Sequence, residues 1–246
     1  MENINKDTIN IFGVNIDKTD YGILLGKIYI AAEKKRKLSI TYTNSSTLNS
    51  SYNNSHNQDL LNSFELVHPD GIGVYLASKL LYGKNGLSSR MTGSDFYPKL
   101  IEEGIKRKWG FYFFGHDNST LEKINARNPE LKITGVNEGY SFDTNKLKER
   151  INNSGTDILV IGLGFPKQEI WINENKNKLK CSVIIAVGDG IKVFAGTKKR
   201  GTALIRKLGL EWAVRLIYSP FKYWRRYMVG NPLFLYRIIK LKLSKL

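Results

Sequence analysis

Hydrophobic residues in this chain gather in short runs that alternate with segments of helical periodicity. The runs at 157–164 ("DILVIGLG") and 182–188 ("SVIIAVG") are almost continuously apolar, which is typical of strands buried on both faces of a parallel sheet. Further strands are predicted over residues 37–43, 64–67, 109–115 and 131–136. The pattern favours an α/β fold: a Rossmann-like, mostly parallel sheet covered by helices on both faces.

Helices are predicted between these strands. One runs from Gly71 to about Tyr82, directly after a Pro-Asp-Gly turn. Ser94 is a good N-cap and is expected to begin a second helix that extends to residue 108. Further helices are predicted to begin near residues 117, 143 and 166.

The segment after residue 195 differs from the rest of the chain. It is helical in pattern, aromatic and basic, so we predict a core domain over residues 1–195 and a C-terminal appendage over residues 196–246. In the last helix, Arg237 and Lys240 share one side and apolar residues cover much of the remainder, a composition that suits a membrane interface. A helix packed on the core with a solvated basic face is the alternative interpretation.

Charge is distributed unevenly along the chain. The formal net charge is +16, yet residues 1–191 carry 24 bases and 21 acids, whereas residues 192–246 carry 14 bases and a single acid, Glu211. So basic a segment indicates a phosphate-bearing partner: nucleic acid, anionic lipid or a phosphorylated substrate. Cys181 is the sole cysteine, which excludes an internal disulfide and suits a reducing compartment. The polar N-terminus lacks a signal-peptide pattern, and no apolar run reaches the length of a membrane span.

Polar residues and glycines cluster where the predicted strands end. Because ligands of an open parallel sheet bind at the carboxyl ends of its strands, these residues predict a cleft. One acid, several amide or hydroxyl side chains and glycine-rich backbone would line it. They are Asp70 after one strand, Thr43 and Asn44 at the tip of another, Gly162, Gly164, Lys167 and Gln168 after a third, and Asp189 after a fourth.

The stretch "GLGFPKQE" at 162–169 is a strand–turn–helix whose glycines let backbone N–H groups approach a ligand. A helix that starts there can take the negative charge of a diphosphate. Lys167 stands where a Gly-x-Gly-x-x-Gly motif would have its last glycine, so the stretch is not a dinucleotide fingerprint. A tight strand-to-helix turn without a ligand is the alternative.

Other candidate residues are less specific. His68 could act as a base, although a histidine beside a proline turn is more often structural, and Asp95 suits a helix-capping role. Three scattered histidines and one cysteine make a transition-metal site improbable. Asp70 and Asp189 could share a divalent ion with a diphosphate, but neither stands in an Asp-x-Asp arrangement, so we expect no metal and no cofactor.

Several sequence blocks occur together in a distinctive order. They are "PDGIGV", "SRMTGSDF", "FFG", "GLGFPKQEIWI", "VGDGIKVFAG" and "GLEWAVRLIYSPFKYWRRYMVGNPLFL". Over roughly residues 8–235 the chain resembles the WecG/TagA/CpsF glycosyltransferases, also called glycosyltransferase family 26. The resemblance implies an inverting, metal-independent enzyme that moves a sugar from a UDP donor to an undecaprenyl-diphosphate-linked sugar. The acceptor would lie on the cytoplasmic face of a bacterial plasma membrane, and the product would feed teichoic acid or another surface polysaccharide.

The resemblance also implies roles for individual residues. Asp70 aligns with the family's proposed general base, and Arg90 with its functional arginine after the Pro-Asp-Gly block. Gln168 matches the glutamine of the Pro-Lys-Gln-Glu block. The C-terminal arginines, thought to engage diphosphate, fall on Arg215 and on Arg225 or Arg226. The donor hexose is left open between an N-acetylmannosamine type and a glucose type.

Two other kinds of function compete with this interpretation. The basic, aromatic appendage could bind single-stranded nucleic acid by stacking, but the core shows no recognisable nucleic-acid motif. An inactive scaffold is disfavoured because Asp70, Arg90 and Gln168 are all present. We therefore expect a peripheral enzyme that contacts anionic membrane through its appendage and binds no nucleic acid, with homo-oligomer formation left open.

Overall fold

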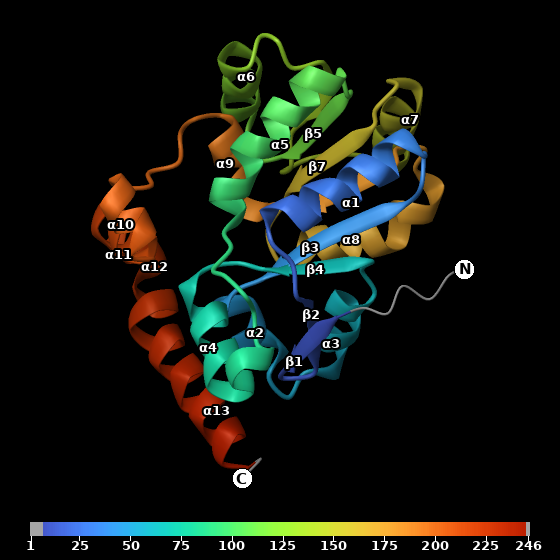
Figure 1. The fold of residues 1–246 in the computed structure, drawn as a ribbon. Coiled ribbons are helices and arrows are strands. Elements are labelled where there is room, and N and C mark those ends of the chain that lie inside the picture. Colours follow the sequence, from blue (N-terminus) through green and yellow to red (C-terminus); the bar gives the residue numbers. More distant parts are fainter. Residues whose placement is uncertain (1–6, 245–246) are drawn as a thin grey trace.

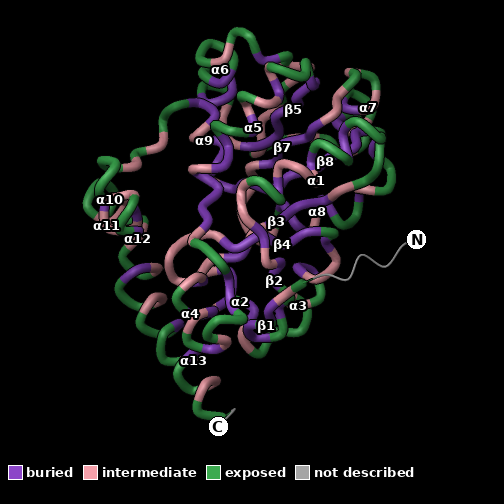
Figure 2. Tube along the Cα trace, in the orientation of Figure 1, coloured by how far each residue is buried: buried purple, intermediate pink, exposed green. Residues whose placement is uncertain are grey.

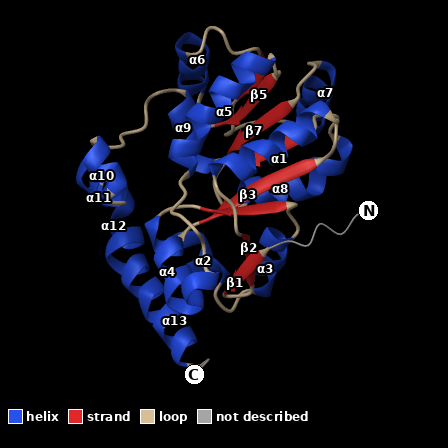
Figure 3. Ribbon diagram, viewed as in Figure 1, coloured by secondary structure: helices blue, strands red, loops and turns tan. Residues whose placement is uncertain are grey.

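A six-stranded, entirely parallel sheet forms the centre of the protein (Figures 1 and 3). The computed structural model describes residues 7–244, and the sheet order is β4-β3-β8-β7-β5-β6. An antiparallel hairpin, β1–β2, forms a separate two-stranded sheet. The strands are β1 (Thr8–Ile11), β2 (Val14–Asp17), β3 (Leu38–Thr43), β4 (Leu66–Pro69), β5 (Phe111–Gly115), β6 (Ile133–Asn137), β7 (Ile158–Gly162) and β8 (Val183–Ala186).

Helices cover both faces of the central sheet. The longer ones are α1 (Tyr21–Glu33), α4 (Ile72–Tyr82), α5 (Gly93–Arg107), α6 (Asn118–Arg127), α7 (Thr144–Asn153) and α13 (Asn231–Leu243). The shorter ones are α2 (Ser45–Ser51), α3 (Ser55–Asn62), α8 (Lys167–Asn175), α9 (Ile191–Phe194), α10 (Ala203–Lys207), α11 (Glu211–Tyr218) and α12 (Pro220–Trp224). Single turns lie at Gly83–Asn85, Lys176–Lys178 and Gly188–Gly190, and a π-helical segment at Arg225–Gly230 joins α12 to α13.

Alternation along the strands divides the apolar core into two clusters. In β7, Ile158 and Val160 pack with the cluster on the side of α1, α5, α6 and α9. Leu159 and Ile161 point the other way, into the cluster formed with the hairpin, α3, α4, α7 and α8. Since successive strand residues face opposite sides, a strand that is apolar throughout requires this double cover.

The predicted fold class is confirmed, and all six predicted strands form the sheet. The predicted N-cap at Ser94 is wrong, because α5 begins two residues earlier. Thr92 has an extended backbone and its Oγ1 accepts from Asp95 N at 3.2 Å, which makes Thr92 the cap. The β1–β2 hairpin was not predicted from the sequence.

The final helices lie along one side of the core (Figure 1). Phe234 and Ile238 of α13 are buried against the cluster that contains Val74 and Ala77 of α4. Arg237 donates to the backbone and side-chain oxygens of Asn49, so this cation faces the core. Much of the segment over residues 196–244, for which we keep the name appendage, is nevertheless exposed (Figure 2). Over residues 7–244, none of the helices combines the length and the apolar character that crossing a bilayer would require.

Candidate active site

A cavity of about 620 Å³ opens at the carboxyl ends of β3, β4 and β8. This is the edge at which open α/β sheets bind their ligands. We call the cavity-lining residues 42–190 the core wall and those between 198 and 238 the appendage wall. The core wall includes Tyr42, Asn44, Asp70, Arg90, Tyr97 and Asp189, and the appendage wall includes Lys198, Glu211, Trp212, Arg215, Lys222, Tyr223 and Arg226.

Asp70 is held at the tip of β4 by backbone hydrogen bonds. Its amide N donates to Thr43 O at 2.7 Å, and its carboxylate Oδ1 accepts from Gly93 N at 2.9 Å, in the first turn of α5. Gly71 follows with φ +94°, a backbone conformation that residues with a Cβ atom rarely adopt. Within residues 7–244 no donor engages Oδ2. The Pro-Asp-Gly turn thus fixes a carboxylate in the cavity and leaves one oxygen for a ligand.

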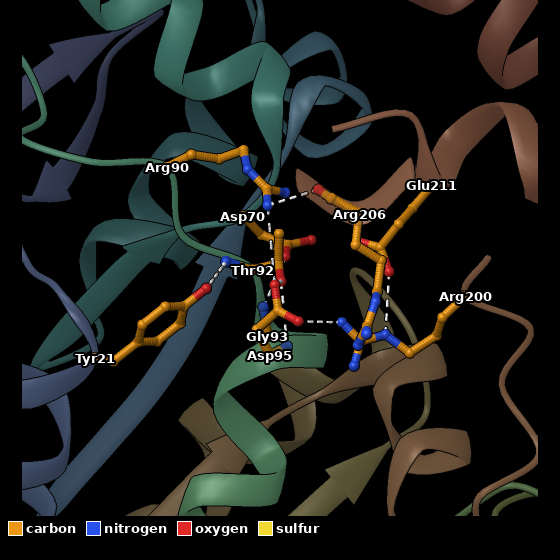
Figure 4. Close-up of polar contacts among 9 residues, drawn as sticks. All are labelled: Tyr21, Asp70, Arg90, Thr92, Gly93, Asp95, Arg200, Arg206 and Glu211. Atoms are coloured by element: carbon orange, nitrogen blue, oxygen red, sulfur yellow. Dashed lines mark hydrogen bonds and ion pairs between the residues drawn. The ribbon is translucent and has the colours of Figure 1, made fainter. Parts of the chain in front are cut away.

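Charged side chains link the core wall to the appendage (Figure 4). Arg90 Nη2 donates to Arg206 O at 2.8 Å and lies 4.0 Å from Asp95 Oδ2. Arg200 binds Asp95 and also donates from Nε to Glu211 Oε1 at 3.1 Å. Burial alone would raise the pKa of Asp95, but the hydrogen bond and charge of Arg200, with Thr92 and Arg90, hold it below its usual value.

Five cations and three carboxylates line the cavity, so its lining is net positive. Three of the cations, Lys198, Arg215 and Arg226, come from the appendage, and Lys222 adds a fourth. Arg215 Nε donates to Tyr227 OH at 2.7 Å, and Arg226 has a buried Nε without a hydrogen-bond partner among the described residues. An unpaired buried donor is costly, which an anionic ligand would relieve.

Two of these cations have shifted pKa values. Burial lowers the pKa of Lys198, although the charge of Asp189 acts in the opposite direction. Burial would also lower the pKa of Arg215, but Tyr227 and the charge of Asp70 raise it. The carboxylates of the core wall therefore interact electrostatically with both side chains. The sequence alone did not single out Lys198, since nothing in "KKR" says which of its side chains enters the cavity.

Six of the twelve predicted site residues line the cavity: Asn44, Asp70, Arg90, Asp189, Arg215 and Arg226. Asn44 also caps α2, where its Oδ1 accepts from Ser46 N and Thr47 N. The other six are not part of the lining. They are Thr43, Gly162, Gly164, Lys167, Gln168 and Arg225.

Alternation and burial explain most of these placements. Thr43 is fully buried, while Tyr42 beside it lines the cavity, because adjacent strand side chains face opposite sides. Lys167 is exposed, and the guanidinium of Arg225 stacks on Trp224, with its carbon 5.3 Å from the ring centroid. Of the two neighbouring arginines, Arg226 is the one that reaches the cavity.

Gln168 lies beneath the cavity rather than on its surface. The side chain is fully buried, and Oε1 accepts from Gly188 N at 2.9 Å and from Gly164 N at 3.2 Å. Its Nε2 donates to Glu169 Oε1, which also accepts from Thr41 Oγ1. Gln168 therefore ties together the loops that follow β7 and β8. His68 is also buried, and burial lowers its pKa.

The side chains of residues 7–244 include no cluster of three or more histidine, cysteine or acidic groups placed to hold a metal ion. The cations that line the cavity are arginines and lysines, side chains that commonly bind phosphate oxygens.

The fold and the cavity define a class of protein: an α/β protein with a cavity at the carboxyl edge of a parallel sheet, where such folds bind their ligands, lined by carboxylates and by cations of the kind that bind phosphate. Residues 9–246 match the family described as "Glycosyl transferase WecG/TagA/CpsF family". The match covers nearly the whole chain, so the protein belongs to this family of glycosyltransferases.

Similar proteins of known name agree with this assignment. A protein of Bacillus subtilis (strain 168) is 31% identical over 76% of this chain and 73% of its own length. A protein of Staphylococcus aureus (strain MW2) is 28% identical over 98% of this chain and 96% of its own. Both carry the name N-acetylglucosaminyldiphosphoundecaprenol N-acetyl-beta-D-mannosaminyltransferase. The family resemblance predicted from the sequence is confirmed.

Proposed function

We propose that the protein transfers a hexose from a UDP-sugar to the sugar of an undecaprenyl-diphosphate-linked acceptor, in synthesis of teichoic acid or a related surface polysaccharide. The transfer inverts the anomeric carbon and uses no metal. N-acetylmannosamine is the first donor to test, because the relatives' name contains it. The observation that carries the proposal is that Asp70 and five cations line one cavity.

Asp70 suits the role of general base. In a single in-line displacement, the acceptor hydroxyl attacks the anomeric carbon and its proton passes to the carboxylate, while the bond to the β-phosphate oxygen breaks and UDP leaves. Two backbone contacts fix Asp70, and its free Oδ2 is the atom proposed to take the proton. Held in this way, the carboxylate can meet a hydroxyl without reorganising.

Cations suit the role of stabilising the departing diphosphate. Arg215 and Arg226 line the cavity from the appendage and Arg90 lines it from the core. Guanidinium groups bind phosphate oxygens in bidentate geometry and carry a charge that cannot titrate near neutral pH. We assign these three arginines to the diphosphates of donor and acceptor, a task that a divalent metal performs in other sugar transferases.

The appendage surface suits contact with an anionic membrane. Phe221 is 94% exposed and Ile217 77%, and further exposed apolar side chains lie nearby among cations. Apolar side chains can enter the lipid interface while each Lys or Arg near the surface contributes about 1 kcal/mol. We propose that this surface docks on the cytoplasmic face of the plasma membrane. Other surface residues of this kind are Tyr218, Trp224, Met228, Leu233 and Tyr236.

A direct assay tests the reaction. The protein is incubated with a panel of UDP-sugars and a short-chain lipid-diphosphate N-acetylglucosamine acceptor, with and without EDTA, and products are read by mass and anomeric NMR. We expect one hexose to be added with inversion, equally in both conditions. Absence of product with every donor, retention of configuration, or a requirement for a divalent cation would contradict the corresponding part of the proposal.

Membrane contact is tested by flotation with anionic vesicles, compared with a gel shift using DNA and RNA at moderate salt. We expect flotation, and weaker flotation of the Phe221→Ser variant. Nucleic-acid binding without flotation would instead favour a nucleic-acid partner for the appendage.

A further inference from the structure

Part of the cavity lining, here called the apolar end, carries no charge, in contrast to the groups around Asp70. Ile72, Leu76 and Leu80 line it from α4, and Leu235 and Ile238 line it from α13. Residues four apart share one side of a helix, so the three α4 residues form a stripe about 12 Å long at 1.5 Å per residue. The stripe begins two residues after Asp70, at the start of α4.

The apolar end is a groove with a buried floor and exposed rims. Ile238 is 1% exposed and packs in the core, whereas Leu76, Leu80 and Leu235 are 57%, 43% and 56% exposed. Helices α4 and α13 run alongside each other here (Figure 1). Helix α4 already buries Val74 and other residues in the core, so Leu76 and Leu80 form a second apolar side of the same helix.

The chemistry of the lining matches one type of ligand. The charge of Asp70 acts on Lys198 and Arg215, and the apolar stripe of α4 leads away from Asp70 within the same cavity. A molecule with a sugar hydroxyl, a diphosphate and a hydrocarbon chain in sequence would place each part against matching groups. A membrane phospholipid has no sugar hydroxyl to present to Asp70.

We propose that the groove between α4 and α13 binds the first isoprene units of the lipid-linked acceptor. This inference rests on the proposed function and adds to it a site for the lipid next to the diphosphate. The groove holds the start of the chain and thereby aligns the sugar hydroxyl with Asp70. The open rim allows the rest of the chain to leave toward the membrane.

A series of water-soluble acceptors tests the groove without a membrane. N-acetylglucosamine diphosphates bearing methyl, prenyl, geranyl and farnesyl groups are compared by KM in the absence of vesicles and detergent. We expect KM to fall about tenfold or more from methyl to farnesyl as apolar surface is buried. The Leu76→Gln/Leu80→Gln variant should lose most of this dependence and keep wild-type affinity for UDP.

Leu204→Gln is the matched control, because Leu204 is 66% exposed on the appendage but does not line the cavity. It should keep the chain-length dependence. The proposed groove would be rejected if the wild-type KM did not depend on chain length. It would also be rejected if the control variant lost this dependence as fully as the double variant. Absence of transfer to every acceptor, the short ones included, would instead reject the proposed function itself.

A labelling experiment avoids dependence on the double variant. Cys181 is buried, so Leu76→Cys supplies an accessible thiol in a nearly wild-type protein. Farnesyl acceptor should slow alkylation of this thiol about tenfold or more, whereas methyl acceptor should not. Leu204→Cys should be alkylated at the same rate with either acceptor. Equal protection of both thiols, or no protection of Leu76→Cys, would contradict the proposal.

Discussion

Asp70 and Arg226 face the same cavity from walls that are held in place by different kinds of contact. The core wall follows strands whose apolar side chains fill two buried clusters, and backbone hydrogen bonds fix Asp70 itself. Within residues 196–244 the buried side chains are few: Glu211, Val214, Tyr227, Phe234 and Ile238. Asp70 and the cations of the appendage wall therefore depend on different parts of the fold, so they can be perturbed separately.

Loss of the Asp70 carboxylate, the proposed general base, should have the largest effect on activity. Asp70→Asn keeps an oxygen that can accept from Gly93 N, so the loop should stay in place while the proton acceptor is lost. We expect kcat to fall about 10³-fold, within the usual range for a general base, with UDP binding unchanged. Turnover and UDP affinity of the purified variant measure this. Near-wild-type turnover would reject the role of Asp70.

The appendage wall is tested by a pair of neighbouring arginines. Arg226→Gln removes a cation from the cavity, and we expect kcat to fall about 10²-fold, as when a transition-state donor is lost. Arg225→Gln is the matched control. Its side chain lies outside the cavity lining and stacks on Trp224, so activity should stay within about twofold. The reverse ranking would place the other arginine on the diphosphate.

Lys198 tests the junction between the two walls. Lys198→Met keeps much of the side-chain volume and removes a positive charge that interacts with Asp189 and Asp70. We expect kcat/KM to fall about tenfold, equivalent to about 1.4 kcal/mol. Because burial lowers the pKa of Lys198, its charged form is disfavoured in the fold, so the variant should melt no lower than the wild type. A lower melting temperature without loss of activity would show a purely structural lysine.

The ion pair that joins the walls should give the smallest effect on activity and a measurable effect on stability. Asp95→Asn weakens the bond to Arg200, and we expect the free energy of unfolding to fall by about 2 kcal/mol at pH 7. For a chain of this size, that lowers Tm by roughly 4–8 °C. Asp7→Asn is the control, because Asp7 pairs with Lys18 in a more exposed position outside the cavity lining, so its loss should change the stability little.

The same variant carries a pH dependence. The folded pKa of Asp95 lies below its ordinary value, so the charged carboxylate stabilises the fold fully above the unfolded pKa of about 3.9. This stabilisation is lost as pH falls through the folded pKa. The difference in Tm between wild type and Asp95→Asn should therefore be constant from pH 7 to 5 and shrink below about pH 4. A difference independent of pH would show that charge is not the cause.

Much of the core was predictable because its signals are local. Continuous apolar runs such as 157–164 identified buried parallel strands, and the Pro-Asp-Gly turn placed Asp70 at a strand end. The hairpin before residue 18 was missed. Its partly alternating residues form very short strands, whose pairing depends on tertiary contacts as much as on pattern.

The site was predictable only in part, because orientation is not a local property. The sequence placed Thr43 and Gln168 near strand ends and Arg225 in the basic segment, but it did not show which side chains turn toward the cavity. At the first position the neighbour Tyr42 lines the cavity instead of Thr43, and in the basic segment Arg226 lines it instead of Arg225. Which side chain faces the cavity depends on the alternation along a strand and on the rotational position along a helix. A shift of one residue in a strand turns the side chain to the opposite face.

Glu211, the one acid among residues 192–246, is buried beside Arg200 instead of lying on the surface. Over residues 196–244 the charged side chains that face solvent are therefore all positive. Two copies of the protein that approached through these faces would repel each other, despite the aromatic side chains that both expose. On the anionic membrane proposed above, lipid headgroups would neutralise these cations, and the exposed apolar side chains would enter the lipid interface in the same state in which the repulsion is lost.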